Sequence, residues 1–363
     1  METLKTDVLI VGSGPAGSTA AKYAARKNVQ VTFIERRTQV GVPVRCGEMI
    51  PSIEEIRGMF VNAENIEELF DTPYNLRLRE IQAIRLVNPK EKIVDLPFVG
   101  YTLDRDRLDQ HLASEAEKEG AQLIKNCQFN SIKDGRAITS KGEIEYKVII
   151  GADGPGSRVS KELGLPKVEH PYPAVTAQAK GDFEPYVVMY FGGIAPGAYS
   201  WVIPKKGQAN VGVGFSPKFA SGTLSEYFSS FVKKHNFEII NKLEGKFVPS
   251  EGPITNTVKD NGMVVGDAAG HVISVNGGGV PLALIAGRIC GNVAGDNILN
   301  GRSLEDYQTE WRRVMLKSLK TAAFNKKMAD VFAFGSDWRT GLCMGILGQR
   351  RMGNLIRCKR LFP

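Results

Sequence analysis

The apolar and polar positions at the start of the chain follow a strand, helix, strand pattern. Residues 7–11 are a short run of β-forming apolar side chains, which is typical of a buried parallel strand. Residues 18–28 are rich in alanine and predict a helix, and residues 29–34 predict a second strand. Between the first strand and the helix, residues 12–17 read Gly-Ser-Gly-Pro-Ala-Gly. The pattern therefore predicts a βαβ unit with a glycine-rich turn after its first strand.

This turn has the composition of a dinucleotide-binding site. Gly12 permits a tight turn, Gly14 lets the backbone approach a pyrophosphate, and Gly17 lets the helix pack closely on the strand. The helix N-terminus would then present free N–H groups to the phosphates. Glu35 follows the second strand, where an acid accepts hydrogen bonds from the adenosine ribose. An acid at this position argues against a 2′-phosphate, which leaves FAD or NAD as the cofactor.

Two later segments decide for FAD. Residues 148–150 predict a strand that ends in a turn containing Asp153, and a second such strand precedes Asp267, whose carboxylate is placed to bond a ribityl hydroxyl. Glycines 277–279 open a predicted helix over residues 280–293. The N-terminus of that helix would stabilise negative charge on a reduced flavin ring. Each segment alone is an ordinary glycine-rich turn, so the argument rests on their combination.

In this order and spacing the three segments resemble the fingerprints of the p-hydroxybenzoate hydroxylase-type flavoprotein superfamily, over residues 1 to about 300. The Arg-x-x-Leu-Asp signature of that superfamily is present at residues 105–109. No second G-x-G-x-x-G unit follows, so we expect no separate NAD(P) domain. The resemblance implies that FAD is bound by Gly12, Gly14, Ala16, Gly17, Glu35, Cys46, Gly47, Met49, Arg105, Phe129, Asp153, Gly266, Asp267, Gly278, Gly279 and Val280.

Two further motifs narrow the resemblance. Residues 43–48 read Pro-Val-Arg-Cys-Gly-Glu, and residues 196–204 match the pattern P-x-x-Y-x-W-x-[FI]-P. Both are similar to the geranylgeranyl reductase family, most closely to its archaeal digeranylgeranylglycerophospholipid reductases, which hydrogenate isoprenoid double bonds of membrane-lipid precursors. Ile203 stands where that family often has Phe. This difference affects the shape of a lipid channel more than the chemistry.

The resemblance makes Cys46 the first catalytic candidate, as proton donor or flavin modulator, and Glu48 the second. The structural alternative for Cys46 is a small buried hydrophobic residue, although Arg45 places a positive charge beside it. Tyr199 and Trp201 alternate along a predicted strand and therefore share one face. That face either belongs to an ordinary sheet core or lines a channel for the isoprenoid chain.

We expect an α/β fold with a Rossmann-like FAD-binding domain, a mixed-sheet substrate domain and a short helical C-terminal region. Within the substrate domain, residues 186–191, 200–204 and 209–215 predict strands. By superfamily precedent the two domains interleave. The predicted ranges are 1–75, 100–160 and 255–300 for FAD binding, 76–99 and 161–254 for the substrate, and 301–363 for the C-terminal region.

The segment after Ser303 differs from the rest of the chain. Residues 304–328 have a helical and basic pattern, and large apolar side chains among arginines follow them. Such a run is either a solvated basic face or an amphipathic surface element in contact with anionic lipid.

Composition sets the remaining limits. The 363 residues are 42% hydrophobic and 24% charged, which excludes a disordered or collagen-like chain, and the net charge is +8. Five scattered cysteines predict no disulfide framework and a reducing compartment, and four histidines predict no metal site. No targeting signal or uninterrupted apolar run of ~18–20 residues occurs. We therefore expect a cytoplasmic protein, with peripheral contact at the cytoplasmic face of the membrane left open by the tail.

The resemblance implies an FAD-dependent reductase that saturates double bonds of geranylgeranyl chains, foremost those of archaeal membrane-lipid precursors, by hydride transfer and protonation. Ferredoxin, a reduced deazaflavin or NAD(P)H would supply electrons, and we expect no nucleic-acid partner. A flavin monooxygenase and an electron-transfer or quinone-linked flavoprotein are the alternatives. A flavin-dependent halogenase is disfavoured because its W-x-W-x-I-P motif lacks the first Trp here. The substrate stays open between phospholipid, diphosphate, quinone tail and chlorophyll side chain.

Overall fold

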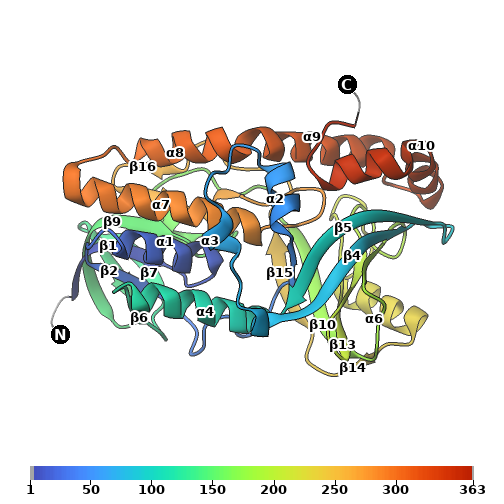
Figure 1. Ribbon diagram of the computed structural model, residues 1–363, viewed down its shortest axis with the longest axis horizontal. Coiled ribbons are helices and arrows are strands. Elements are labelled where there is room, and N and C mark those ends of the chain that lie inside the picture. The colour runs from blue at the N-terminus through green and yellow to red at the C-terminus, as the bar shows by residue number, and fades with distance from the viewer. Residues whose placement is uncertain (1–3, 362–363) are drawn as a thin grey trace.

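The computed structural model describes residues 4–361. It contains two sheets, one toward each end of an elongated molecule, and C-terminal helices that run along one side of both (Figure 1). The predicted α/β fold class is confirmed.

The first sheet has eight strands and a parallel centre, in the order β16-β17-β9-β1-β2-β6 with β7 and β8 attached to β9. β1 pairs in parallel with both β2 and β9. The strands are β1 (Leu4–Val11), β2 (Val31–Ile34), β6 (Gln122–Ile124), β7 (Phe129–Lys133), β8 (Arg136–Thr139), β9 (Gly142–Gly151), β16 (Val258–Lys259) and β17 (Gly262–Val264).

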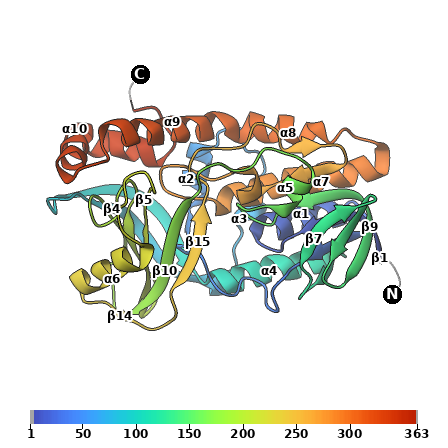
Figure 2. The same cartoon turned by 180° about the vertical axis from the view of Figure 1, so that it is seen from behind.

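Alternate residues of β1 enter different cores because successive strand side chains point to opposite faces. Val8 and Ile10 pack with α1 (Pro15–Ala25), α4 (Arg105–Lys118) and α7 (Val280–Asn300). Leu9 and Val11 pack with α5 (Arg158–Glu162) and the β7–β8 hairpin, on the side seen in Figure 2. The predicted βαβ unit is confirmed, with the second strand starting at Val31.

The second sheet has nine strands, in the order β14-β10-β13-β12-β11-β4-β5-β3 with β15 paired to β10. One face packs on α6 (Leu224–His235), and the other packs on α10 (Asp337–Ile356). The strands are β3 (Met49–Pro51), β4 (Arg77–Val87), β5 (Ile93–Leu103), β10 (Tyr172–Lys180), β11 (Tyr186–Tyr190), β12 (Ser200–Pro204), β13 (Gln208–Gly214), β14 (Glu238–Ile239) and β15 (Glu244–Val248).

The remaining helices form connections and the C-terminal region. The helical prediction for residues 304–328 is confirmed, because α8, a π-helical turn and α9 follow one another directly. Within the described residues, no helix is long and apolar enough to cross a bilayer. These elements are α2 (Ile53–Met59), α3 (Glu67–Phe70), η1 (Tyr74–Leu76), η2 (Gly266–Ala269), α8 (Glu305–Trp311), η3 (Arg312–Leu316) and α9 (Lys317–Phe332).

The chain passes between the two sheets four times. The first sheet takes strands from residues 4–34, 122–151 and 258–264, and the second sheet takes strands from residues 49–103 and 172–248. β3 pairs with β5 in the second sheet although the sequence assigned residues 1–75 to the FAD-binding unit. The exact domain boundaries stay a prediction.

Three glycines on α7 allow it to pack directly against α1. A Cβ atom on Gly287 would lie 2.6 Å from the carbonyl oxygen of Ala16, and one on Gly291 would lie 2.3 Å from that of Ala20. A Cβ on Gly295 would lie 2.6 Å from the Lys27 side chain. Any side chain at these positions would push the helices apart. The spacing of four residues puts all three glycines on one face of α7, so the contact fixes how the two helices lie together.

Candidate active site

The glycine-rich turn leaves open space in front of α1. Gly12 has φ +104°, and a Cβ there would lie 2.4 Å from the Ala152 carbonyl oxygen, so only glycine fits. A Cβ on Gly14 would meet nothing within 4 Å. Gly14 is also the N-cap of α1, and no side chain caps this end. Uncapped N–H groups facing open space form an anion-binding site.

Glu35 lies beside this turn, at the end of β2. Its Oε2 accepts hydrogen bonds from the backbone N–H of Ser13 at 3.3 Å and from the Ser13 hydroxyl at 2.9 Å. The carboxylate is therefore held next to the anion site, at the position predicted for a ribose-binding acid.

A second uncapped helix N-terminus lies at the start of α7. Gly279 is the N-cap, no side chain bonds the end of the helix, and a Cβ on Gly279 would lie 3.2 Å from Asp267 Oδ1. Asp267 forms an ion pair of 2.7 Å with Lys246 of β15. Gly266 touches α1, since a Cβ there would lie 2.8 Å from that of Ala16. The N-terminal ends of α1 and α7 therefore both lie beside the turn at Gly266.

These groups fit FAD. The uncapped N-terminus of α1 suits the pyrophosphate, Glu35 suits the ribose, and the uncapped N-terminus of α7 suits the flavin ring.

Two residues predicted to bind FAD direct their side chains away from this site. The Asp153 carboxylate caps α5 by accepting bonds from the Ser157 hydroxyl at 2.5 Å and the Arg158 N–H at 2.7 Å. Phe129 is buried in the core behind the first sheet.

Cys46 is held by two donors. Its Sγ accepts hydrogen bonds from Arg105 Nη1 at 3.1 Å and from the backbone N–H of Glu48 at 3.3 Å. Asp109 anchors Arg105 through both carboxylate oxygens. Burial lowers the pKa of Arg105, but the charge of Asp109 outweighs burial and the pKa is raised. The cation beside the thiol is thus Arg105.

The sequence had assigned that role to Arg45, and this is wrong. Arg45 Nε donates to Glu244 Oε2 at 3.2 Å. A neighbour in sequence was mistaken for a neighbour in space.

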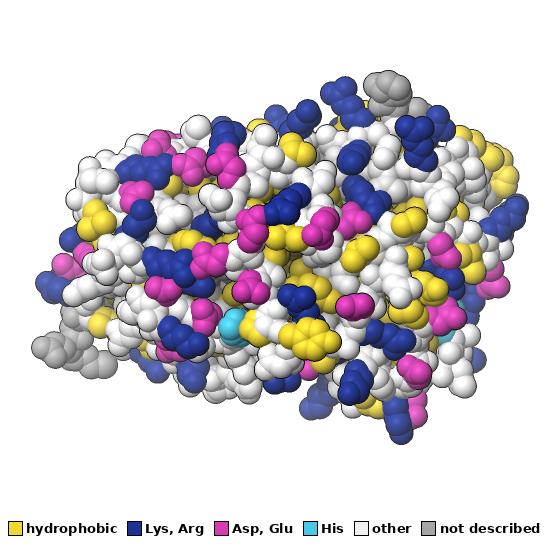
Figure 3. All heavy atoms as spheres, viewed as in Figure 1, with side chains coloured by type: hydrophobic (Ala, Val, Ile, Leu, Met, Phe, Trp, Pro, Cys, Tyr) yellow, Lys and Arg dark blue, Asp and Glu magenta, His cyan; other side chains and the backbone are white. Residues whose placement is uncertain are grey.

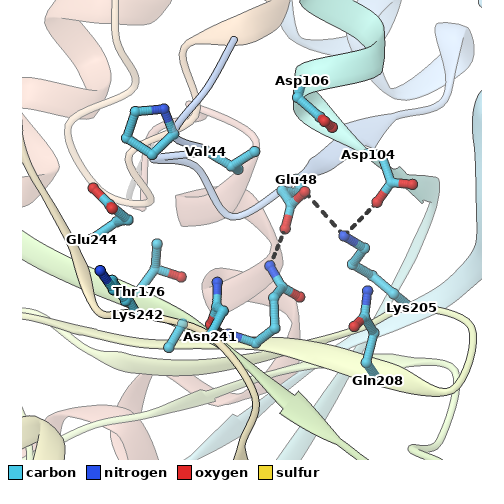
Figure 4. A pocket seen from close by; sticks show the side chains of 13 residues that line it. Val44, Glu48, Asp104, Asp106, Thr176, Lys205, Gln208, Asn241, Lys242 and Glu244 are labelled. Atoms are coloured by element: carbon cyan, nitrogen blue, oxygen red, sulfur yellow. Dashed lines mark hydrogen bonds and ion pairs between the residues drawn. The ribbon is translucent and has the colours of Figure 1, made fainter.

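Glu48 is 2% exposed and has a left-handed backbone with φ +64°. Its Oε1 accepts from Lys205 Nζ at 3.1 Å and from the Arg105 N–H at 3.3 Å. Its Oε2 accepts from Gln178 Nε2 at 2.7 Å and from Asn210 Nδ2 at 2.9 Å. One buried carboxylate thus joins the loop of Cys46 to α4 and to the second sheet (Figure 4).

Lys205 lies between two carboxylates. In addition to Glu48, it pairs with Asp104 at 2.7 Å (Figure 4). Burial lowers the pKa of Lys205, but Glu48, and then Asp104, outweighs burial and the pKa is raised. Lys205 therefore stays charged in the site.

Asn210 is fully buried and uses every hydrogen-bonding group of its side chain. Its Nδ2 donates to the Cys46 carbonyl at 2.9 Å as well as to Glu48. Its Oδ1 accepts from the Trp201 indole at 2.8 Å and from the Thr176 hydroxyl at 2.7 Å. The position of Trp201 relative to Cys46 is therefore set through this one amide.

The other motif aromatic ring, Tyr199, connects to α7. Its hydroxyl donates to the Asn276 carbonyl at 2.5 Å, in the loop before the Gly277–Gly279 run, and its ring meets that of Trp201 edge-on at 5.9 Å. Burial raises the pKa of Tyr199, so the hydroxyl remains a donor. A Cβ on Gly47 would lie 2.8 Å from Ile203 Cδ1. The two family motifs are thus in contact.

One face of the second sheet is polar at its β10–β13 end and apolar at its β11–β4 end. The cross-strand row of Thr176, Gly212, Trp201, Met189 and Leu86 shares that face. Its β10–β13 end also carries Gln178 and Asn210. Its β11–β4 end belongs to an apolar cluster closed by Met344, Met352 and Ile356 of α10, with Met49, Tyr199 and Trp201 packed against it. The polar end borders a cavity of about 410 Å³ that Thr176, Gln178, Lys205 and Gln208 help to line.

Sequence reasoning missed Lys205, Asn210, Gln178, Asp104 and Lys246. Thr176 and Gln178 alternate with alanines on β10, and this polar alternation on an otherwise buried strand was the available signal. The partners of these five residues are up to 164 residues away in the chain, so no local pattern identifies them.

Family comparisons match both parts of the chain. Residues 5–185 match an FAD binding domain, and residues 172–247 match a geranylgeranyl reductase catalytic domain. A digeranylgeranylglycerophospholipid reductase from Methanosarcina acetivorans is 34% identical over 339 residues, covering 84% of this chain and 80% of the relative. One from Methanocaldococcus jannaschii is 32% identical and covers 89% of this chain and 88% of the relative.

Solved structures show the same fold. A geranylgeranyl bacteriochlorophyll reductase-like protein from Thermoplasma acidophilum has a TM-score of 0.80 at 28% identity, covering 90% of this chain and 88% of that one. A flavin-dependent brominase has a TM-score of 0.70 at 18% identity, covering the same shares, and is similar in fold alone.

Proposed function

The chain belongs to the geranylgeranyl reductase family and is an FAD-dependent reductase of geranylgeranyl chains, and from this premise we propose that its substrate is a digeranylgeranyl glycerophospholipid, a precursor of membrane lipid. The observation that carries the proposal is the sheet face that is apolar under α10 and is joined to the loop of Cys46 by the Trp201–Asn210–Cys46 hydrogen bonds. An isoprenoid chain lying on the apolar half would bring a double bond to that boundary.

The chemistry requires a hydride and a proton on the two alkene carbons. Bound reduced FAD supplies the hydride. We propose that the Cys46 Sγ–H supplies the proton: its lone pairs face Arg105 and Glu48, which leaves the S–H bond free to point at the substrate. The thiolate left behind would be stabilised by Arg105. Glu48, Lys205 and Asn210 would hold the loop, while α10 would exclude water.

We also propose the predicted FAD contacts, from Gly12, Gly14, Gly17 and Glu35 to Asp267 and the start of α7. Their support is the pair of uncapped helix ends. The electron donor remains one of ferredoxin, a reduced deazaflavin or NAD(P)H. The five cysteines are all free thiols, which supports a reducing cytoplasmic setting. The basic C-terminal helices support peripheral contact with an anionic membrane.

The test is a product assay with reductant and defined prenyl substrates, read by mass spectrometry. The proposal predicts a gain of one hydrogen pair per double bond, largest for the digeranylgeranyl phospholipid. Equal rates on a free prenyl diphosphate would reject the phospholipid assignment. Oxygen incorporation would indicate a monooxygenase, and electron transfer without any mass gain would indicate an electron carrier.

The role of Cys46 is tested by Cys46→Ala, with Cys343→Ala on α10 as the matched control. Loss of a general acid lowers the turnover rate by about 100-fold or more, whereas the control keeps its rate. A Cys46→Ala variant with full FAD content and full prenyl-reducing rate would show that another group donates the proton.

A further inference from the structure

The net charge of the protein lies in one segment. Residues 317–363 contain ten lysines and arginines and two acidic residues, so this segment carries +8, which is the net charge of the whole chain. Residues 1–316 are therefore neutral overall. The two acids are engaged: Asp330 pairs with Lys326, and Asp337 accepts a bond from the Gly193 N–H. Seven of the ten cations are exposed to solvent, while Lys326 is buried and Arg357 pairs with Glu55.

The same segment exposes large hydrophobic side chains. Of the fifteen large hydrophobics that are strongly exposed among the described residues, six lie on α9 and α10. We call them the α9–α10 apolar surface: Phe324, Val331, Phe332, Trp338, Leu342 and Ile346. Figure 3 shows hydrophobic side chains at the end of the molecule occupied by α10, with lysines and arginines near them.

Helix geometry aligns the part of this surface that lies on α10. Trp338, Leu342 and Ile346 are spaced by four residues and share one face of α10. The turn between the helices is fixed, because the Thr340 hydroxyl donates to the Ala333 carbonyl at 2.9 Å and Cys343 Sγ donates to that of Phe332 at 3.4 Å. The exposed ends of α9 and α10 are thus held against each other.

The opposite face of α10 closes the apolar half of the second sheet. Met344 lies on that face of the stretch before Gly348, where α10 is kinked, and Met352 and Ile356 lie beyond the kink; all three are buried in one cluster with Leu86 and Met189. α10 is thus apolar on both sides, with one side against the proposed prenyl site and the other side against solvent. Basic residues flanking an exposed apolar face favour an anionic lipid surface, since the charges attract the headgroups and the side chains enter the acyl boundary.

We propose that the α9–α10 apolar surface docks on an anionic lipid bilayer, with Trp338 entering the interface, so that α10 separates the bilayer from the prenyl site. The docking surface is a property of this segment, whereas its link to substrate delivery rests on the proposed function. An acidic surface on a partner protein would also attract the lysines and arginines of this segment. It would not favour the exposed apolar side chains of Trp338, Leu342 and Ile346.

Intrinsic fluorescence of the full-length protein provides the test. Of the three tryptophans, Trp311 is fully buried, Trp201 is partly buried, and Trp338 is 66% exposed. Adding phosphatidylcholine vesicles that contain phosphatidylglycerol should shift the emission to the blue, and vesicle flotation should recover the protein. Pure phosphatidylcholine vesicles should bind far less, and added salt should reverse binding.

Two variant sets separate the contributions of charge and apolar contact. The first set removes three exposed cations, by Lys320→Gln, Lys327→Gln and Arg350→Gln. It should weaken vesicle binding about 100-fold, because each cation near an anionic surface raises the affinity about fivefold. Trp338→Ser, Leu342→Ser and Ile346→Ser together should abolish flotation. The matched control removes three exposed hydrophobics from other elements, Tyr74→Ser, Ile240→Ser and Leu299→Ser, and should bind as the wild type.

Unchanged flotation of both variant sets would overturn the proposal, and so would equal binding to neutral vesicles. A dimer in light scattering that the Trp338 set converts to monomer would also overturn it, by showing that a second copy covers the surface. Reduction of a detergent-dispersed prenyl substrate is measured in parallel. Vesicle binding without any prenyl reduction would reject the proposed function and leave the docking surface intact.

Discussion

Replacing Lys205 by Met tests whether the buried ion pair with Glu48 holds the site together. The substitution keeps a long unbranched stem and removes the ammonium. Glu48, at 2% exposure, would lose its cation but keep the donors Gln178, Asn210 and the Arg105 N–H. Asp104, which is partly exposed, would turn to solvent. The cost therefore comes almost entirely from one uncompensated buried carboxylate.

Breaking a buried pair by removing one partner costs about 3–5 kcal/mol. Because Glu48 keeps three hydrogen-bond donors, we expect Lys205→Met to lower the free energy of unfolding by about 3 kcal/mol, the lower end of that range. Breaking a surface pair costs only about 0–1 kcal/mol. For 363 residues unfolding as one unit, the loss from Lys205→Met lowers Tm by about 4 °C. The pKa of Lys205 is raised in the folded state, so the pair stabilises fully below the ordinary lysine pKa and is lost as pH rises through the raised value. The deficit should therefore be constant between about pH 7 and 9.

Urea unfolding of Lys205→Met, Glu48→Gln and the double variant provides the measurement. The double variant should lose less stability than the two single variants lose together, because it leaves neither partner uncompensated. Lys242→Met, exposed in the same cavity, is the control and should stay within about 0.5 kcal/mol of the wild type. A Lys205→Met loss as small as that of the control, or strictly additive losses, would refute the reasoning.

Three shorter predictions concern other parts of the site. Asn210→Ala leaves the Trp201 indole without its hydrogen-bond acceptor, so the turnover rate in steady-state assays should fall at least about tenfold. The FAD content, measured by absorbance, should not change. Gly291→Ala places a Cβ 2.3 Å from the Ala20 carbonyl and should cost about 1–3 kcal/mol in urea unfolding and weaken FAD binding in fluorescence titration. Burial lowers the pKa of His271 to about 3, so the unfolded chain takes up its proton first and stability falls as pH drops below about 6.5. From pH 7.5 to 5, the wild type should lose about 2 kcal/mol more than His271→Leu in urea unfolding.

Each of these has an outcome that contradicts it. An Asn210→Ala enzyme with normal kinetics would show that Cys46 and Trp201 are positioned by other contacts. Unchanged FAD affinity in Gly291→Ala would mean that the α1–α7 contact does not shape the cofactor site. Parallel pH profiles for the wild type and His271→Leu would show that His271 titrates normally in the folded protein.

The elements around the cofactor site were predictable because they are local. The strand, glycine turn and helix over residues 7–28 lie within one stretch of chain, and each glycine has a steric reason that is visible in the sequence. The family motifs placed Cys46 and Trp201 in the same region without showing what joins them.

The network around Glu48 was not predictable, because its members come from five separate segments of the chain. Asn210 and Cys46 are 164 residues apart, and their contact exists only once β13 pairs with β10 and β12. The same limit explains the error at Arg45, since adjacency in sequence says little about direction in a loop. Arg105, which does reach the thiol, starts a helix 59 residues away.

The four crossings of the chain between its sheets limit how this protein can be divided. A protease cut at any crossing would leave strands of one sheet on both fragments, so neither fragment could refold as an independent half. Exchanging the second sheet for that of another reductase would require two inserts, residues 49–103 and 172–248, each joined at both ends to strands that stay behind. Substrate range in this architecture is therefore easier to change through point substitutions on β11, β12 and α10 than through transplanted domains.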